Sequence, residues 1–191
     1  AIRQPQLITD KFALTKDSYI LFLGRLVPEK GIRYLVEAFK EVKTDKKLVI
    51  AGGSSDTDDF TAELKNLAKG DDRIIFTGFV QGQLLDELYS NAYIYTLPSD
   101  LEGMPLSLLE AMSYGNCCLV SDIPECTEVV EDKAIIFKKS DVSDLKKKLQ
   151  EACEHPEIVK RLKEQAADYI CRKYNWDDVV KETVKLYRRD I

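Results

Sequence analysis

Histidine is almost absent from this sequence, and so are the motifs of several common catalytic and phosphate-binding sites. The single histidine, His155, directly precedes a proline and is interpreted as a surface residue. One histidine so placed, with no Gly-x-Ser-x-Gly motif for a nucleophilic serine, gives little support to a hydrolase triad. The chain has no Gly-x-Gly-x-x-Gly pattern after its first apolar run, which argues against a nicotinamide dehydrogenase. It also lacks the Gly-x-x-x-x-Gly-Lys-Ser/Thr loop of many NTPases.

Long apolar runs and paired cysteines are missing as well. No apolar run approaches the roughly 20 residues that cross a bilayer, and no signal-peptide pattern opens the chain, so we expect a cytoplasmic protein. The five cysteines include no Cys-x-x-Cys pair, which leaves neither a disulfide framework nor a zinc site supported. A net charge of −5 argues against a nucleic-acid partner, so any anion site has to be local.

The chain has instead a regular alternation of short apolar runs and helical patterns. Tyr19–Gly24 is a continuous apolar run of strand length, followed by a loop and a helical pattern through Leu35 and Phe39. Apolar strands indicate a sheet covered on both faces, and strands that alternate with helices indicate parallel pairing. We therefore predict an α/β fold, a single Rossmann-like domain with a parallel sheet flanked by helices. Further strands are expected at Leu48–Gly52, Ile74–Phe76, Tyr93–Leu97, Cys117–Ser121 and Ala134–Phe137, and further helices at Phe60–Leu67, Leu84–Tyr89, Asp141–Cys153 and Glu157–Lys173.

The two ends of the chain are expected to differ from this core. Residues 1–17 lack clear periodicity and are interpreted as a linker or the edge of a larger chain, with the domain itself at 18–173. Residues 174–191 are expected to form a C-terminal helix. Its apolar stripe, from Trp176 to Tyr187, needs a partner surface on this domain or on a missing one.

The stretch from Leu97 to Gly115 carries the strongest sign of a ligand site. It is expected to form a strand end, a loop and a helix of about three turns, with Pro105 at the first helical position and Gly115 just past the end. The first turn of such a helix leaves backbone N–H groups unpaired, and Gly103 has no side chain to keep an anion away, so the pattern predicts a phosphate site. Glu102 and Glu110 either border the ligand or, in the simpler alternative, are solvated side chains of an amphipathic helix.

Two basic residues, Arg25 and Lys30, flank a proline-containing turn after the first strand. Arginine can donate two N–H bonds to a phosphate and lysine supplies a mobile charge, so together they can neutralise a diphosphate. In an open parallel sheet, ligands bind at the carboxyl ends of the strands, where the strand order reverses. This loop and the Leu97–Gly103 loop are therefore expected to share one ligand, and Glu110 can accept hydrogen bonds from ribose hydroxyls.

Five sequence blocks stand in the order of a known family. They are Gly24-Arg25 with Glu29–Gly31, Phe76–Phe79, Leu97–Ser99, Glu102–Leu106 and Glu110-Ala111. Together they resemble the C-terminal, donor-binding half of retaining glycosyltransferases of the two-Rossmann-domain type, family 4 or group 1. The spacing from Glu102 to Glu110 is that of the family's Glu-x7-Glu signature, and the resemblance covers nearly all of Ser18 to Tyr187. One departure is Asp132–Phe137, which lacks the glycine usual there.

The resemblance assigns roles to single residues. It implies that Arg25 and Lys30 contact the donor diphosphate and that Glu110 binds the ribose. Glu102 would touch the transferred sugar near its reacting face and is the candidate catalytic residue. The remaining positions implied are Gly103, Met104, Pro105 and Leu106 at the diphosphate and Gly78, Phe79 and Val80 at the base.

The resemblance also implies an activity and partners. A retaining, metal-independent transferase with no cofactor would move a hexose from a UDP-, GDP- or ADP-sugar to an acceptor hydroxyl. The acceptor is expected to be a saccharide or lipid-linked saccharide in cell-surface polysaccharide or glycolipid synthesis, with peripheral binding at the inner face of the membrane as an option for the full-length protein. Family members place the acceptor on an N-terminal Rossmann domain that is missing here, so the fragment alone is expected to be inactive. Two alternatives stay open: a stand-alone nucleotide-sugar-binding or regulatory module, and half of a sugar-nucleotide epimerase or phosphorylase.

Overall fold

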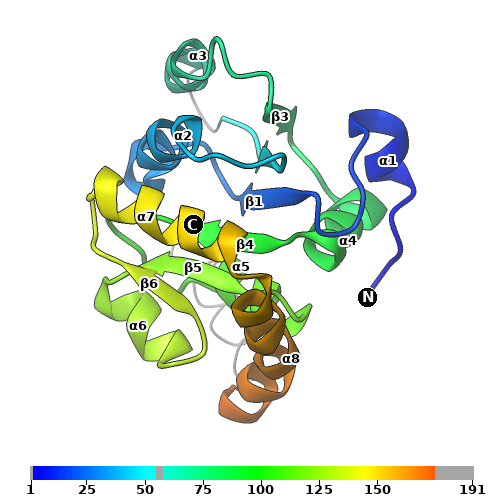
Figure 1. Cartoon of the computed structure of the whole chain (residues 1–191), viewed down its shortest axis with the longest axis vertical. Coiled ribbons are helices and arrows are strands. Elements are labelled where there is room, and N and C mark those ends of the chain that lie inside the picture. The colour runs from blue at the N-terminus through cyan, green and yellow to red at the C-terminus, as the bar shows by residue number, and fades with distance from the viewer. Residues whose placement is uncertain (1, 55–57, 175–191) are drawn as a thin grey trace, which may run out of the picture.

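Six parallel strands form one sheet in this computed structural model, which describes residues 2–54 and 58–174 (Figure 1). The strands are β1 (Tyr19–Leu23), β2 (Lys47–Ala51), β3 (Ile74–Gly78), β4 (Ile94–Leu97), β5 (Cys118–Ser121) and β6 (Ile135–Phe137). Their order in the sheet is β3-β2-β1-β4-β5-β6, so β2 and β3 lie on one side of β1 and the later strands on the other. The predicted Rossmann-like α/β fold with a parallel sheet is confirmed.

The strands are mostly apolar, as expected for a sheet that helices cover on both faces. Ile20, Leu21 and Phe22 of β1 are fully buried. In the register of the sheet, Ile20 lies between Leu48 of β2 and Ile94 of β4. The core is therefore centred on β1 and β4, and the loops that follow these two strands start at the edge of this core.

The helices form two layers around the sheet. They are α1 (Leu7–Phe12), α2 (Ile32–Lys40), α3 (Asp58–Leu67), α4 (Gly82–Asn91), α5 (Leu106–Ser113), α6 (Pro124–Val130), α7 (Val142–Glu154) and α8 (Pro156–Lys173), with a short 3-10 helix, η1, at Pro28–Lys30. In one layer α2 packs against α3 and α7, and in the other α5 packs against α8 and α1 against α4. The stacked rings of Tyr89 and Tyr114, with centroids 5.0 Å apart, join α4 to the end of α5.

The helices α6 and η1 are additions to the elements that the sequence predicted. Both are short and begin with a proline at the first helical position, Pro124 and Pro28, where the missing amide has no intrahelical partner to lose. The helix expected at 174–191 lies outside the described residues, apart from Tyr174.

Residues 2–17 contain a packed helix instead of the expected linker. Ile8 in α1 is fully buried, as is Leu14 just after it. Glu87 from α4 accepts hydrogen bonds from the backbone amides of Gln6, at 2.6 Å, and Ile8, at 3.3 Å. These amides belong to the first turn of α1, which has no intrahelical acceptors for them. Burial opposes ionisation of Glu87, but the hydrogen bonds from Gln6 and its other donors outweigh this effect and lower the pKa of its carboxyl group.

Replacing Glu87 with glutamine is expected to destabilise the domain by about 1.5–3 kcal/mol at pH 7, because two amides lose a charged acceptor. The lowered pKa of Glu87 means that this contribution is complete above the ordinary glutamate value of 4.5 and is lost as the pH falls further. Urea unfolding at pH 7 and at about pH 3 measures both effects. Glu151→Gln, at an exposed position of α7, is the control and should leave the unfolding free energy unchanged. A Glu87→Gln defect of the same size at both pH values would contradict the assignment.

Candidate functional site

The loops that follow β1 and β4 lie side by side at the carboxyl edge of the sheet. Asp100 in the β4 loop donates its backbone amide to the carbonyl oxygen of Glu29 in the β1 loop, at 2.9 Å. A Cβ atom on Gly31 would lie 1.9 Å from the carbonyl oxygen of Pro98, so the two backbones are in contact. Gly31 also has a φ of 70°, which L side chains rarely adopt. The two loops therefore share one edge at the reversal of strand order, as the sequence predicted.

Lys30 and Glu102 form an ion pair between these loops. The Lys30 Nζ atom lies 2.8 Å from Oε1 and 3.0 Å from Oε2 of Glu102, so it bridges both carboxylate oxygens. Only 5% of the Glu102 side chain and 20% of the Lys30 side chain are exposed. Ser99 donates a further hydrogen bond of 2.6 Å to Glu102 Oε1. The structure thus brings the lysine expected at the diphosphate into direct contact with the acid expected at the sugar.

Helix α5 begins after Pro105 rather than at it. Pro105 has φ −80° and ψ 73°, a turn that directs the Leu106 amide back onto the Met104 carbonyl oxygen at 2.9 Å. The Pro105 carbonyl then accepts from the amides of Leu108 and Leu109. The helix has eight residues, a little over two turns rather than the expected three. The Leu106 amide is occupied, so it does not join the predicted phosphate cradle in this structure.

Other backbone donors remain open at the start of α5. Among the described residues, no hydrogen bond uses the amides of Gly103, Met104 or Ser107 as donors. Gly103 is exposed, and a Cβ atom on it would meet nothing within 4 Å. Free N–H groups at a helix N-terminus favour negative charge, and the ammonium group of Lys30 lies on the adjoining loop. The arrangement can therefore hold an anionic group.

The end of α5 has the geometry that the sequence predicted. Gly115 has a φ of 83°, and its amide donates to the carbonyl oxygen of Met112 at 2.9 Å. The amide of Asn116 donates to the carbonyl oxygen of Ala111 at 3.1 Å. These two bonds form a Schellman motif, which ends the helix by pairing carbonyl groups that its last turn leaves open.

Backbone hydrogen bonds extend the edge from β1 to the loop after β3. The Leu26 amide donates to the Gly53 carbonyl oxygen at 3.1 Å, and the Gly52 amide donates to the Gly78 carbonyl oxygen at 3.0 Å. The ends of β1, β2 and β3 are thereby fixed to one another. The loop expected at the base is part of the same continuous edge as the loop expected at the diphosphate.

The side chains of this edge differ in exposure. Arg25 is exposed, and its guanidinium group is open to solvent next to the end of β1. Phe79 is 74% exposed, whereas Val80 beside it is buried. Arg25 and Phe79 are therefore accessible at this edge, whereas Val80 is not.

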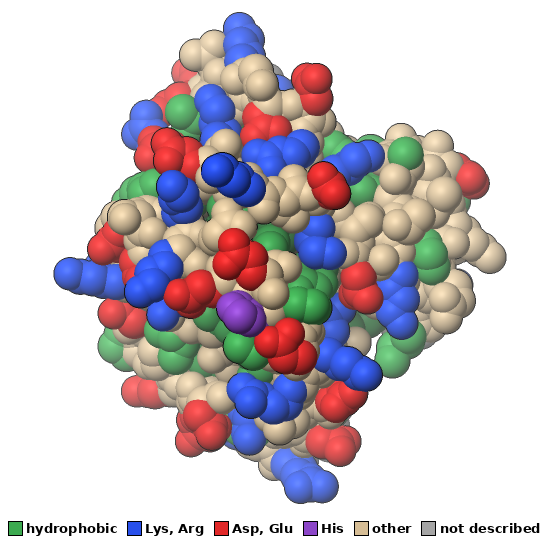
Figure 2. Space-filling view, viewed as in Figure 1, with side chains coloured by type: hydrophobic (Ala, Val, Ile, Leu, Met, Phe, Trp, Pro, Cys, Tyr) green, Lys and Arg blue, Asp and Glu red, His purple; other side chains and the backbone are tan. Residues whose placement is uncertain are grey.

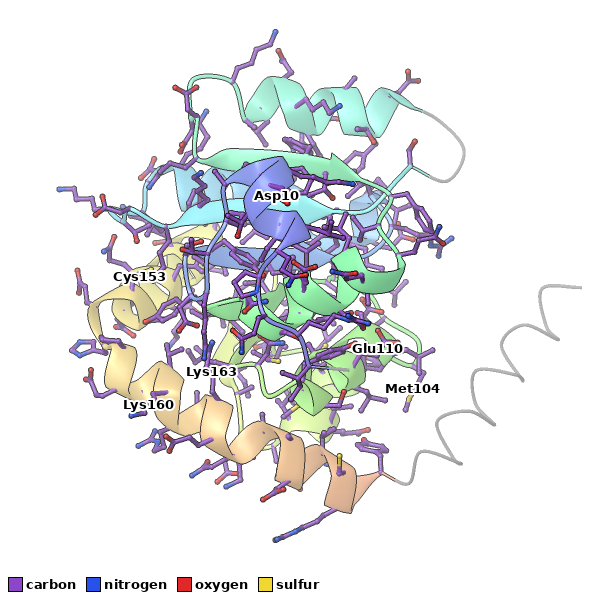
Figure 3. All side chains as sticks on the ribbon, turned by 90° about the vertical axis from the view of Figure 1, so that its right-hand side faces the viewer. Asp10, Met104, Glu110, Cys153, Lys160 and Lys163 are labelled. Atoms are coloured by element: carbon purple, nitrogen blue, oxygen red, sulfur yellow. The ribbon has the colours of Figure 1, made fainter. Side chains whose placement is uncertain are left out.

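Glu110 lies on the outer side of α5, at the same end of the domain as Met104 and far from Lys160 (Figure 3). Neighbouring protein atoms partly desolvate its carboxyl group, which raises its pKa. The nearby Tyr89 hydroxyl opposes this rise and the charge of Asp86 adds to it. Glu110 therefore holds its negative charge less readily than an ordinary surface glutamate.

Asp100 fixes the β4 loop to distant parts of the chain, and the sequence analysis did not single it out. Its carboxylate accepts from the Tyr34 hydroxyl in α2, at 2.7 Å, and from Ser140 Oγ, at 2.6 Å. An aspartate in a loop often accepts hydrogen bonds from the loop itself, so its presence there could have been noticed in the sequence. Its partners could not be predicted, because Tyr34 and Ser140 are 66 and 40 positions away from Asp100.

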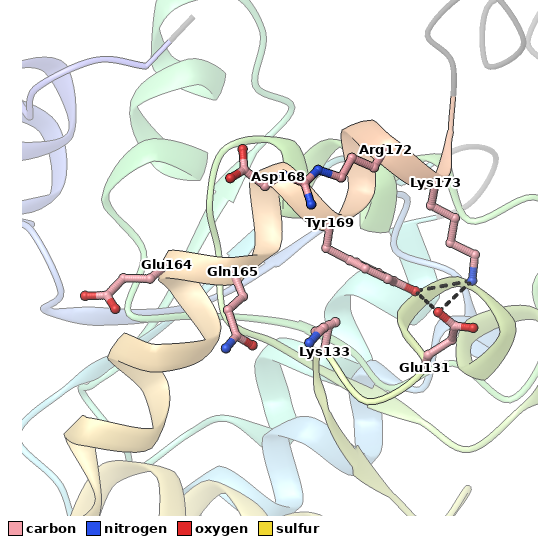
Figure 4. Close-up of a pocket in the computed structure, with 8 residues that line it drawn as sticks. All are labelled: Glu131, Lys133, Glu164, Gln165, Asp168, Tyr169, Arg172 and Lys173. Carbon is pink, nitrogen blue, oxygen red and sulfur yellow. Dashed lines mark hydrogen bonds and ion pairs between the residues drawn. The ribbon is translucent and has the colours of Figure 1, made fainter.

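A hollow of about 610 Å³ lies between α8 and the loop after α6 (Figure 4). Tyr169 donates to Glu131 Oε2 at 2.8 Å, and Lys173 Nζ lies 3.6 Å from the same oxygen. Glu131 has a φ of 48°, a conformation that glycine adopts more readily, just before the segment that lacks the family's usual glycine. Acidic and basic side chains line this hollow together, so it has no preference for an anion.

The single histidine is a surface residue, as expected. His155 lies between α7 and α8, its side chain is 52% exposed, and Figure 2 shows it among acidic side chains. Its Nδ1 atom lies 3.2 Å from Glu157 Oε1.

Within residues 2–54 and 58–174, no three His, Cys, Asp or Glu side chains are grouped so as to hold a metal ion. None of the helices in those residues has the length and apolar character that a membrane span needs.

The order of the strands and the charged loops at their carboxyl edge define a Rossmann-like α/β domain with a candidate anion site. The family model described as "Glycosyl transferases group 1" matches residues 5–169, and the chain belongs to this glycosyltransferase family. The resemblance inferred from the sequence blocks is confirmed. The match begins ahead of α1, in agreement with the packing of that helix on the domain.

Known proteins match this chain over most of its length. The chain is 32% identical over 180 residues to "Uncharacterized glycosyltransferase MJ1607" of Methanocaldococcus jannaschii, covering 90% of this chain and 45% of that protein. The C-terminal domain of a glycosyl transferase group 1 family protein (LpcC) from Francisella tularensis matches with a TM-score of 0.72 and 24% identity, over 83% of this chain and 87% of that one. Anabaena Alr3699/HepE in complex with UDP-glucose matches with a TM-score of 0.82 and 15% identity, over 96% and 52%. The chain spans about half the length of the curated relatives it matches, 45% and 48% for two of them.

Gly31→Ala is expected to lower the free energy of unfolding by more than Gly70→Ala, its matched control. Both glycines have a positive φ, 70° and 88°, so each replacement carries backbone strain of roughly 1–2 kcal/mol. Only at Gly31 would the new Cβ meet the Pro98 carbonyl, because a Cβ on Gly70 has nothing within 4 Å. Urea unfolding measures the difference, which should exceed about 1 kcal/mol. Equal losses in the two variants would show that the loops can separate without cost.

Proposed function

We propose that this chain is the donor-binding domain of a retaining glycosyltransferase that moves a hexose from a UDP-, GDP- or ADP-sugar to an acceptor hydroxyl, with no metal ion or other cofactor. The observation that carries the proposal is the convergence of Lys30, Glu102 and the open amides of Gly103 and Met104 where β1 and β4 adjoin. Membership of the glycosyltransferase family supports the reaction class. The complex of HepE with UDP-glucose, on the same fold, supports a nucleotide-sugar donor.

In the proposed reaction, the donor diphosphate is the leaving group. Arg25 and Lys30 bind it together with the open amides at the start of α5, so that positive charge and N–H dipoles face the oxygen on which negative charge develops. The bond between the sugar carbon and the diphosphate oxygen breaks and the sugar becomes oxocarbenium-like. The acceptor hydroxyl then attacks the sugar carbon from the face that the diphosphate leaves and gives its proton to the departing diphosphate oxygen. Glu102 lies at the sugar, near the reacting face.

The nucleoside end of the donor occupies the rest of the edge. Glu110 accepts hydrogen bonds from the ribose hydroxyls, and the loop of Gly78, Phe79 and Val80 borders the base. The backbone bonds that fix this loop to the end of β2 support a preformed surface there.

The acceptor belongs to a part of the protein outside this chain. We propose an N-terminal Rossmann domain of the same parent chain, which binds a saccharide or lipid-linked saccharide acceptor in cell-surface polysaccharide or glycolipid synthesis. The full-length protein would work in the cytoplasm, peripherally at the inner face of the membrane. The proposal is supported by the length of the curated relatives, of which this chain spans about half.

Arg25→Ala is expected to weaken binding of a nucleoside diphosphate by about tenfold or more, since a hydrogen bond to a charged group contributes about 1.5–3 kcal/mol. Calorimetric titration of the chain with UDP, GDP and ADP identifies the diphosphate bound best, and the variant is compared on it. The matching nucleoside has no diphosphate, so it should bind the variant and the wild type equally.

The control is Arg33→Ala, at an exposed arginine of α2 that pairs with Glu63. It should leave binding of all these ligands unchanged. A uniform loss of diphosphate and nucleoside in Arg25→Ala would contradict the assigned contact. Failure of all three diphosphates to bind the wild-type chain would contradict the proposed function.

Glu110→Gln is expected to weaken nucleoside binding and to flatten its pH dependence. Because the pKa of Glu110 is raised, its charge is lost at a higher pH than that of an ordinary glutamate. As the pH is lowered, the wild-type affinity for the nucleoside should therefore begin to fall at a higher pH than the ordinary glutamate value of 4.5 would give, whereas the uncharged variant has no such charge to lose. NMR titration at several pH values measures both slopes, with Glu164→Gln on the exposed side of α8 as the control. Parallel slopes in wild type and Glu110→Gln would remove the ribose role.

A further inference from the structure

Ser99 contacts Glu102 from inside the protein. Ser99 is fully buried, and its Oγ donates to Glu102 Oε1 at 2.6 Å. The carbonyl oxygen of Ser99 accepts a hydrogen bond of 2.5 Å from Oγ of Ser121, which is also fully buried. The Ser121 hydroxyl thus fixes the backbone of Ser99, whose own hydroxyl contacts Glu102.

The two serines follow from the pairing of adjacent strands. Leu97, the last residue of β4, pairs with Val120 of β5, and Ser121 is the last residue of β5. Ser99 lies two residues beyond Leu97, so the bond between Ser121 and Ser99 continues the contact of the two strands past the end of β4. The hydroxyl that meets Glu102 is therefore anchored to the sheet rather than to a free loop.

Lys30 is less suited to hold Glu102 throughout a reaction. Its ammonium group is a mobile charge on a flexible four-carbon stem, and a diphosphate bound beside it competes with the carboxylate for its three N–H donors. Ser99 is fully buried and cannot be reached by a ligand in the same way. Among the described residues, Lys30 and Ser99 are the two hydrogen-bond donors to the Glu102 side chain.

We propose that Ser99 is a positioning residue, which keeps the Glu102 carboxylate in its orientation while Lys30 binds the donor diphosphate, and that Ser121 holds Ser99 in place. The inference rests on the proposed role of Glu102 at the transferred sugar. In this inference, Lys30 can exchange its bond to Glu102 for one to the donor diphosphate, whereas Ser99 keeps its bond to Glu102 throughout.

The kinetic test compares Ser99→Ala with Thr96→Val in the proposed two-domain parent protein, with UDP-glucose and GDP-mannose as donors. Thr96 is the matched control, because it is fully buried in β4 and its Oγ1 donates to the backbone carbonyl of Leu21 at 3.1 Å. Ser99→Ala should lower kcat about tenfold or more and change the donor KM by less than about twofold. Thr96→Val should change neither. An unchanged kcat in Ser99→Ala, or a loss of equal size in Thr96→Val, would overturn the inference.

A double variant shows whether Ser99 acts through Glu102. In a Glu102→Gln background, Ser99→Ala should lower kcat by less than about a further twofold, because the group that Ser99 orients is already altered. A full further loss would overturn the inference, since Ser99 would then act by another route. If Glu102→Gln alone leaves kcat at the wild-type value, both the role of Glu102 and this inference are wrong.

Crystal structures of the chain test the positioning without any turnover. In crystals of Ser99→Ala soaked with UDP, the Glu102 carboxylate should leave its wild-type place, whereas in Thr96→Val it should keep it. Ser121→Ala should produce a smaller displacement of the same kind, and it carries the test if Ser99→Ala does not fold. An unmoved Glu102 would overturn the inference and leave the proposed function intact, whereas a wild-type chain that binds no nucleoside diphosphate would contradict the proposed function.

Discussion

The partly buried ion pair between Lys30 and Glu102 is the interaction on which the arrangement of the candidate site depends. Two opposite charges that leave water are stable together only when their geometry is good and their remaining hydrogen-bonding capacity is used. Lys30 meets this condition by bridging both carboxylate oxygens, and Ser99 supplies a further donor. The partners are 72 positions apart in the sequence, so the pair can form only when β1 and β4 lie next to each other.

The strands could be predicted from the sequence because a strand that is buried on both faces has a continuous run of mostly apolar residues. Tyr19–Leu23 is apolar at every position, and no knowledge of its neighbours is needed to recognise it. Helix α1 has no comparable pattern in its sequence. It has six residues, and the acceptor for its first amides is Glu87, which is 81 positions from Gln6 and 79 from Ile8. A local pattern contains no trace of a contact over that distance, so by itself it indicates a linker.

In the candidate site, the placement of the loops could be predicted and their contacts could not. Parallel strands end at one edge, and ligands bind there where the strand order reverses, so the Lys30 loop and Gly103 could be expected at one site. The rule does not say that Lys30 bonds Glu102, since that depends on side-chain geometry. Pro105 shows the limit of a statistical preference: proline favours the first helical position, but the turn that joins Leu106 to Met104 leaves it just outside the helix.

The contact of Glu87 with the start of α1 matters to anyone who exchanges such domains between proteins. A chimera spliced at residue 18 would import Glu87 without the backbone amides of Gln6 and Ile8, and of its donors among the described residues only the Gln83 side chain would remain. A buried carboxylate that loses hydrogen bonds is costly. A splice ahead of Gln6 keeps the acceptor and its donors from one parent. The segment to be exchanged therefore has to begin before Gln6, because the hydrogen bonds from Gln6 and Ile8 to Glu87 make α1 part of the domain. It does not begin at the first strand.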